Sequence, residues 1–203
     1  MSNEQTVYVV DDDDAVRDVL IWLMESVKLP TQCYSTARDF LDAIEPGQQG
    51  CILLDVRMPG MSGIELQREL KRIGIDMPVI IITGHGDVPM AVHAMKEGAF
   101  DFIEKPFNNQ VLLDQVQAAL AKCREANQAK AEKADAEERL SQLTEREKEV
   151  LELVVAGDTN KAIARTLDIS TKTVEAHRAK VMRKMGAGSL AELVRLANTE
   201  ATT

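Results

Sequence analysis

Short apolar runs alternate with amphipathic segments along the first 120 residues of the chain. The runs lie at residues 6–10, 31–34, 50–54, 78–82 and 99–103. The run at 78–82, PVIII, is nearly all β-branched. A strand of this composition is typical of a parallel sheet whose two faces are both covered by helices. The alternation therefore predicts a doubly wound α/β domain with a five-stranded parallel sheet.

The segments between these runs have helical periodicity. In the first of them, Val16, Val19, Leu20 and Leu23 recur at the spacing of one helix face. The expected helices cover residues 15–26, 37–44, 63–72, 89–97 and 109–120. In an open α/β sheet of this kind, the functional crevice lies at the carboxyl ends of the strands.

Residues 121–142 contain neither proline nor glycine and are rich in Ala, Glu and Lys. This composition favours a helix that continues the last helix of the α/β domain. The helix is either solvated throughout or also forms weak dimer contacts, because most of its apolar residues are alanines. We therefore expect a domain at 1–120 and a helical linker at 121–142, followed by a second domain at 143–203.

The last segment is predicted to be a small all-α helix-turn-helix domain. Thr144 and Glu147 form a capping-box pattern for a helix that ends near residue 156. Further helices are expected at 160–167, 171–185 and 190–198, with Ser170 capping the third of the four. In a helix-turn-helix, the second helix enters the major groove of DNA, and here that helix is 171–185.

The charge of the chain is distributed unevenly. The net charge is −9, but residues 1–120 alone carry 9 basic and 19 acidic residues. Residues 143–203 carry 10 basic and 9 acidic residues, so a local basic surface is compatible with the acidic total. The sequence has no apolar run long enough to span a membrane and no secretion signal. Cys33, Cys51 and Cys123 are widely spaced, and we expect free thiols in a cytoplasmic protein.

Polar residues of the first domain follow the ends of the predicted strands. Asp11–Asp14 follow the first strand, Asp55 ends the third, Thr83 ends the fourth and Lys105 follows the fifth. Crowded carboxylates repel one another unless a cation shares their site, and a hard divalent ion such as Mg²⁺ suits oxygen ligands. Asp13 and Asp14 are better explained as caps of the following helix.

This set of residues is suited to phosphoryl transfer. The reaction needs an oxygen nucleophile and neutralisation of the phosphoryl charge. Asp55 would supply the nucleophile, Lys105 and Mg²⁺ would neutralise the phosphoryl oxygens, and Thr83 would donate a hydrogen bond to one of them.

Residues 5–120 resemble the receiver domains of bacterial two-component response regulators, a flavodoxin-like (CheY-like) fold. The motifs VVDDD, LLDVRMPGMSGIEL, IIITGHGD and FIEKPF stand in the order and spacing of that family. The resemblance implies Asp55 as the phosphoacceptor. It also implies Mg²⁺ bound by Asp12, Asp55 and the backbone carbonyl of Arg57, with Asp11 as an acidic support.

The same resemblance assigns a switch. Thr83 and Lys105 would sense the phosphoryl group, and Phe102 matches an aromatic residue that turns inward when Thr83 moves; Phe102 is otherwise a core aromatic. The stretch GHGDVPMAVHAMKEGAFDF resembles the NarL/FixJ-type branch. Gly84 would leave room beside the phosphoryl site, and His85 either tunes dephosphorylation or is an ordinary surface histidine.

Residues 143–197 are similar to the LuxR-type DNA-binding module over nearly their full length. The helix 171–185, TKTVEAHRAKVMRKM, would turn Val174, Val181 and Met182 to the core. Candidate DNA contacts are Lys172, Thr173, Glu175, Ala176, His177, Arg178, Lys180, Arg183 and Lys184. Ala162 stands where the family often has Glu. Glu175 either accepts a hydrogen bond from a cytosine or only excludes wrong sites.

The resemblance implies a switch controlled by a sensor histidine kinase. Phosphorylation would rearrange a face formed by residues 91–95, 100–103 and 111–115, which then forms a homodimer, releases the output domain, or does both. The dimer would bind double-stranded DNA and act with RNA polymerase. A phosphohydrolase is one alternative, but it would need a second acid at position 57, which is Arg. The other alternative is a phosphorylation-independent DNA-binding or protein-interaction module.

Overall fold

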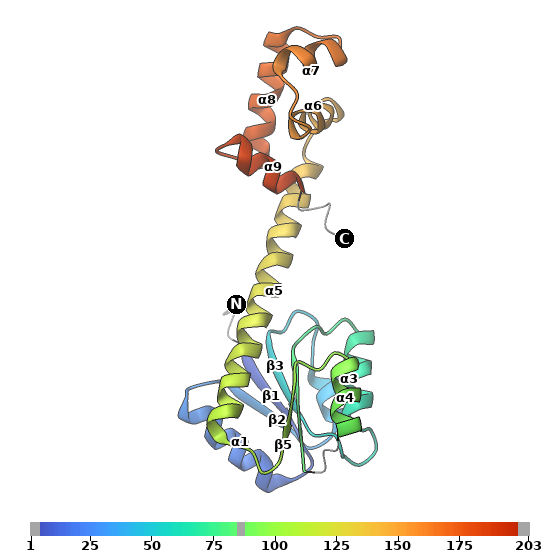
Figure 1. Ribbon diagram of the computed structural model, residues 1–203, viewed down its shortest axis with the longest axis vertical. Helices are drawn as coiled ribbons and strands as arrows, with labels where there is room; N and C mark the ends of the chain where they lie inside the picture. Colours follow the sequence, from blue (N-terminus) through green and yellow to red (C-terminus); the bar gives the residue numbers. More distant parts are fainter. Residues whose placement is uncertain (1–4, 85–87, 199–203) are drawn as a thin grey trace. The chain divides into compact units, whose positions relative to one another are not determined.

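The computed structural model describes residues 5–84 and 88–198 of the chain. The chain forms two compact units, Met1–Ala126 and Asn127–Thr203 (Figure 1). One long helix, α5 (Asn109–Ser141), contributes residues to both units. The helix runs on through most of the segment 121–142 expected to be a helical linker, and its residues from Asn127 onward belong to the second unit.

The first unit is built on a five-stranded parallel sheet with the strand order β2-β1-β3-β4-β5. Its strands are β1 (Thr6–Val10), β2 (Thr31–Tyr34), β3 (Gly50–Leu54), β4 (Val79–Thr83) and β5 (Asp101–Glu104). The central strands β3 and β4 are buried at every position, as their apolar composition requires. The predicted doubly wound parallel sheet is confirmed.

The fifth strand begins two residues later than predicted. The backbone N–H of Ala99 donates to the carbonyl of Ala94, and that of Gly98 donates to the carbonyl of Met95. These two bonds satisfy carbonyl groups at the end of the helix before the strand, so residues 98 and 99 complete a helix cap. The apolar side chain of Ala99 favoured a strand that begins at this residue, but its backbone N–H is bonded to the end of the preceding helix.

Helices cover both faces of the sheet in the first unit (Figure 1). Helices α1 (Asp14–Ser26) and α5 pack on the face that carries Val7 and Val9 of β1. Helices α2 (Ala37–Ala43), α3 (Gly63–Arg72) and α4 (Val88–Lys96) pack on the opposite face. This layering leaves the carboxyl ends of the strands as the edge where the predicted polar residues gather.

The second unit is a cluster of short helices: α6 (Glu145–Val155), α7 (Asn160–Thr166), α8 (Thr171–Met185) and α9 (Leu190–Asn198). The predicted capping box of Thr144 and Glu147 is present, and the Ser170 side chain caps α8. Val174 and Val181 are buried in the core of the unit, and Met182 packs against it. None of the helices in the described part of the chain is long and apolar enough to cross a membrane.

Candidate functional site

One polar residue at the carboxyl end of each of β1, β3 and β4 is deeply buried. The exposed fractions of Asp11, Asp55 and Thr83 are 2%, 7% and 1%. Asp55 directly follows β3, whose five residues are all buried, and its backbone N–H donates to the carbonyl of Val10 on β1. The parallel pairing of the strands thus brings these side chains to one edge of the sheet.

Lys105 joins the two buried carboxylates. Its Nζ lies 2.6 Å from Oδ2 of Asp11 and 2.9 Å from Oδ1 of Asp55. Its backbone N–H donates to the carbonyl of Thr83 at 2.8 Å, which extends the pairing of β4 and β5 to the lysine. The side chains of Asp11, Asp55 and Lys105 therefore meet, and Thr83 is linked to Lys105 through its backbone carbonyl, although the four residues come from the ends of four different strands.

Backbone groups hold the second oxygen of each carboxylate. The N–H of Asp13 donates to Oδ1 of Asp11 at 3.0 Å, and the N–H of Arg57 donates to Oδ2 of Asp55 at 2.5 Å. Asp13 also accepts hydrogen bonds from the first turn of α1, which confirms its predicted capping role. The loops after β1 and β3 therefore fix the orientation of both acids.

Two further residues shape the site, and the sequence analysis did not single them out. Arg17 on α1 donates from Nη1 to the carbonyl of Asp11 at 2.6 Å and also forms an ion pair with Asp14. Gly63 lies so close that a Cβ at this position would be 2.2 Å from the backbone oxygen of Asp55. Glycine is therefore required where α3 begins against the loop that follows β3.

The charges of the cluster are unequal. Burial raises the pKa of Asp11, although the hydrogen bonds from Lys105 and Asp13 oppose this rise. Burial acts to lower the pKa of Lys105, but its hydrogen bonds to Asp11 and Asp55 outweigh that effect and raise the pKa. The ammonium group therefore stays charged, and two carboxyl groups share it.

Other predicted residues lie around this cluster. Asp12 and Arg57 are exposed, while Phe102 is half-buried and packs against the face covered by α2, α3 and α4. A Cβ at Gly84 would meet no atom within 4 Å, so this position is open. His85 lies outside the described residues. Within residues 5–84 and 88–198, no three acidic, histidine or cysteine side chains are already gathered into a metal site.

The side chains of α8 divide into an exposed set and an engaged set. Five of the predicted DNA contacts are exposed, namely Lys172, Glu175, Ala176, Lys180 and Arg183. Thr173, His177, Arg178 and Lys184 are half-buried. Arg178 donates from Nη1 to Oδ1 of Asn160 on α7 at 2.6 Å, so its guanidinium links the two helices of the helix-turn-helix.

The ammonium group of Lys184, a predicted DNA contact, is paired within the second unit. Its Nζ lies 2.6 Å from Oε2 of Glu147 and 3.0 Å from the carbonyl of Gln142. Glu147 is 3% exposed and also accepts the backbone N–H of Thr144. The hydrogen bond from Lys184 is the main cause that lowers the pKa of Glu147 to about 2. This lysine therefore belongs to the structural core of the second unit.

Comparisons with known proteins agree with this division into two units. Residues 7–117 match the family of response regulator receiver domains, and residues 141–197 match the LuxR family of bacterial regulatory proteins. The transcriptional regulatory protein FixJ of Azorhizobium caulinodans is 49% identical over 197 residues, which are 97% of this chain and 93% of that protein.

Solved structures of whole response regulators are also similar. The response regulator StyR is 45% identical with a TM-score of 0.87, covering 96% of this chain and 98% of that chain. Full-length FixJ from B. japonicum is 45% identical with a TM-score of 0.60, and both chains are covered completely. The chain therefore belongs to the NarL/FixJ-type two-component response regulators, which join a receiver domain to a LuxR-type DNA-binding domain and regulate transcription.

Proposed function

We propose that a partner sensor histidine kinase phosphorylates Asp55 and that this controls dimerisation and sequence-specific DNA binding. The observation that carries the proposal is the contact of one ammonium group, Lys105 Nζ, with both Asp11 and Asp55 at a buried edge of the sheet. Two buried carboxylates around one lysine are typical of a functional site rather than of a cluster that serves stability.

Asp55 would act as the nucleophile. One of its carboxylate oxygens would form a bond to phosphorus as the bond between phosphorus and the donor's imidazole nitrogen breaks. The donor nitrogen keeps the electron pair of that bond. Lys105 and the hydroxyl of Thr83 would then bind the phosphoryl oxygens, whose charge must be neutralised during transfer. Any hydrolysis by this protein would be slow turnover of its own phosphoaspartate, so we do not regard it as an enzyme.

The donor set of the pocket fits Mg²⁺. Asp12, Asp55 and the Arg57 backbone carbonyl would hold the ion, with Asp11 as a supporting acid. These are hard oxygen ligands, and the two buried carboxylates exceed the single ammonium in charge. When bound, Mg²⁺ supplies positive charge to the phosphoryl oxygens. The backbone N–H of Arg57 orients the Asp55 carboxylate, and the backbone N–H of Asp13 orients the Asp11 carboxylate.

The face formed by α4, β5 and α5 would carry the signal. Thr83 and Lys105 would move toward the phosphoryl group, and the half-buried ring of Phe102 would follow Thr83. Three large apolar side chains are exposed on this face: Val92 at 46%, Met95 at 45% and Val111 at 50%. Exposed apolar groups of this kind favour a protein contact, and we assign them to a homodimer formed on phosphorylation.

Helix α8 would read DNA as the second helix of the helix-turn-helix. Its exposed residues Lys172, Lys180 and Arg183 are free to bind phosphates, and Glu175 and Ala176 can face bases. Thr173, His177 and Arg178 would contribute from partly buried positions. Lys184 would act chiefly by holding α8 in place, because Glu147 occupies its ammonium group. Two such helices in a dimer would bind paired half-sites and regulate transcription together with RNA polymerase.

The test compares DNA binding and oligomeric state with and without a small phosphodonor and Mg²⁺. The samples are the wild-type protein, Asp55→Asn and the matched control Asp18→Asn, which alters an exposed aspartate on α1. We expect the donor to drive dimerisation and tighter DNA binding in the wild type and in the control only. Identical binding in all samples would instead support a phosphorylation-independent DNA-binding protein.

A further inference from the structure

The last turns of α5 belong to the DNA-binding unit. Ala136 of this helix is only 1% exposed, although the neighbouring residues Asp135 and Glu137 are exposed. Glu132 forms an ion pair with Arg195 of α9, and Leu140 packs against the core of the unit. The end of α5 is thus an integral part of the unit that contains α8.

Arg139 connects this part of α5 to the recognition helix. Its Nη1 donates to the carbonyl of Met185, the last residue of α8, at 2.8 Å. Asp135, one turn earlier on α5, orients the guanidinium through contacts of 3.2 Å to Nε and 2.8 Å to Nη2. Carbonyls in the last turn of a helix lack partners within the helix, and a cation stabilises the negative end of its dipole. Arg139 therefore caps α8 from a different helix.

The connection also runs in the opposite direction. Lys184, in the last turn of α8, donates to the carbonyl of Gln142, the residue that follows α5. The same ammonium contacts Glu147, which caps the start of α6 with Thr144. The turn between α5 and α6 is therefore fixed to the end of α8 by polar contacts on both of its sides.

Gly186 makes the close approach of Arg139 possible. It ends α8 with φ of +67°, a left-handed conformation that glycine adopts without strain. A Cβ at this position would lie 2.3 Å from Nη1 of Arg139. The residue that stops the recognition helix thus also leaves the space that Arg139 needs.

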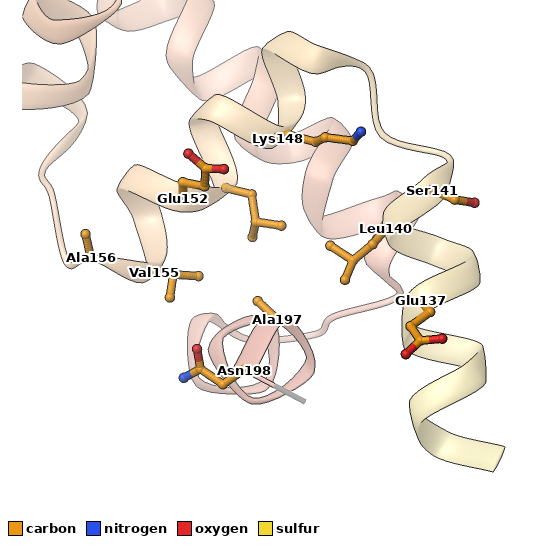
Figure 2. A pocket seen from close by; sticks show the side chains of 10 residues that line it. Glu137, Leu140, Ser141, Lys148, Glu152, Val155, Ala156, Ala197 and Asn198 are labelled. Carbon is orange, nitrogen blue, oxygen red and sulfur yellow. The ribbon is translucent and has the colours of Figure 1, made fainter. Parts of the chain in front are cut away.

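Only part of the surface at the end of α5 packs against apolar side chains of the second unit. A cavity of about 670 Å³ lies between the ends of α5, α6 and α9. Figure 2 shows Leu140 of α5 facing Val155 of α6 and Ala197 of α9 across this space. On this side, α5 faces an open pocket, so the polar contacts of Arg139 and Lys184 add to the apolar packing of Ala136 and Leu140 elsewhere.

We propose that Arg139 is a positioning residue for DNA recognition: by capping α8 from α5, it fixes the recognition helix to the end of the long helix. The inference rests on the proposed role of α8 in reading DNA. Specific DNA binding needs an exact orientation of α8, whereas non-specific binding needs only exposed cations. Loss of Arg139 should therefore weaken specific binding more than non-specific binding.

The test uses the full-length protein and two duplexes: one selected by the wild type from random-sequence DNA, and a scrambled version of it. Arg139→Gln should weaken binding to the selected duplex about tenfold, as loss of a charged hydrogen bond would. Its affinity for the scrambled duplex and the salt dependence of binding should not change. Arg139→Lys should restore part of the loss, because it keeps a cation at the end of α8. Arg124→Gln, at an exposed arginine of the same helix, is the matched control.

Asp135→Asn provides a second variant that keeps the Arg139 side chain. It should cause a smaller loss of the same kind, and the double variant should lose no more than Arg139→Gln alone. Unchanged affinity of Arg139→Gln for the selected duplex would overturn the inference, and so would an equal loss on both duplexes. A wild-type protein that prefers no sequence would instead overturn the proposed role of α8, irrespective of the variants.

Discussion

Each half of the chain buries a carboxylate against a lysine, but the two clusters differ in balance. In the receiver cluster, formed by Asp11, Asp55 and Lys105, one ammonium serves two acids, and burial raises the pKa of Asp11. In the output cluster, formed by Thr144, Glu147 and Lys184, one ammonium serves one acid, and two backbone groups complete the hydrogen bonds. There the pKa of the acid is lowered to about 2.

This difference separates a reactive site from a structural one. A saturated ion pair holds its elements in one arrangement and has no remaining charge to offer a ligand. An unbalanced cluster retains negative charge that a divalent ion can neutralise and an oxygen that can attack phosphorus. The number of carboxylates that share each lysine therefore distinguishes the two clusters: two share Lys105, and one is paired with Lys184.

The largest effect is expected from Lys105→Met, which removes the cation of the receiver cluster. Two carboxylates would then share a buried site without a counter-ion, and the free energy of unfolding of the receiver should fall by about 3–5 kcal/mol. Hydrogen exchange, read separately over each unit, measures this loss. Mg²⁺ should restore part of it, because the ion can replace the missing positive charge.

Lys96→Met, at an exposed lysine on α4, is the matched control and should leave both units unchanged. The proposed difference between the receiver and output clusters would be wrong if Mg²⁺ did not slow hydrogen exchange in the receiver unit of Lys105→Met. In that case, the excess negative charge of the receiver cluster would not be available to a divalent ion.

Ala131→Pro tests whether α5 couples phosphorylation of Asp55 to the DNA affinity of the second unit. Proline inside a helix removes a hydrogen bond and clashes with the preceding turn, at a cost of about 3 kcal/mol. Ala131 is exposed, so the change should affect the helix without disturbing a core. We expect Asp55 to accept phosphate normally while the gain in DNA affinity with phosphodonor disappears. An unchanged gain, measured by fluorescence anisotropy, would remove α5 from the mechanism.

Glu147→Gln tests the output cluster and should lower the free energy of unfolding of that unit by about 2 kcal/mol. The pKa of Glu147 in the folded state, about 2, lies below its usual value of 4.5. The carboxylate therefore stabilises the fold above about pH 4.5, and this contribution is lost as the pH falls toward 2. The stability difference between wild type and variant should shrink over that range.

Hydrogen exchange at about pH 5 and about pH 2.5 would measure this difference, with Glu149→Gln as the control at an exposed glutamate of α6. A difference of the same size at both pH values would show that the ionised carboxylate is not what stabilises the unit. The assignment of a structural ion pair would then be wrong.

Much of the architecture could be predicted because it depends on local pattern. Strand composition placed Asp55, Thr83 and Lys105 at strand ends, and the parallel sheet then had to bring them together. Capping at Thr144 and Ser170 follows from side chains that bond to backbone only a few residues away. These features need no knowledge of which elements pack together.

The features that were missed depend on tertiary contacts. Lys184 and Glu147 are 37 residues apart, and nothing in the charge pattern of α8 distinguishes this lysine from Lys180. Arg139 and Met185 are 46 residues apart, and the acceptor is a backbone carbonyl that has no sequence signature. Long-range polar contacts of this type become visible only when the packing of the helices is known.

The smallest effect is expected from Lys180→Ala, which removes an exposed cation of α8 outside the output cluster. It should reduce the salt dependence of DNA binding by about one unit of slope and leave stability unchanged. Lys184→Ala should do the opposite, because its ammonium is already paired: stability falls while the slope changes little. DNA titrations at several salt concentrations measure both slopes. If the two variants lowered the slope equally, Lys184 would reach a phosphate in the complex, and the output cluster would be part of the DNA-binding surface.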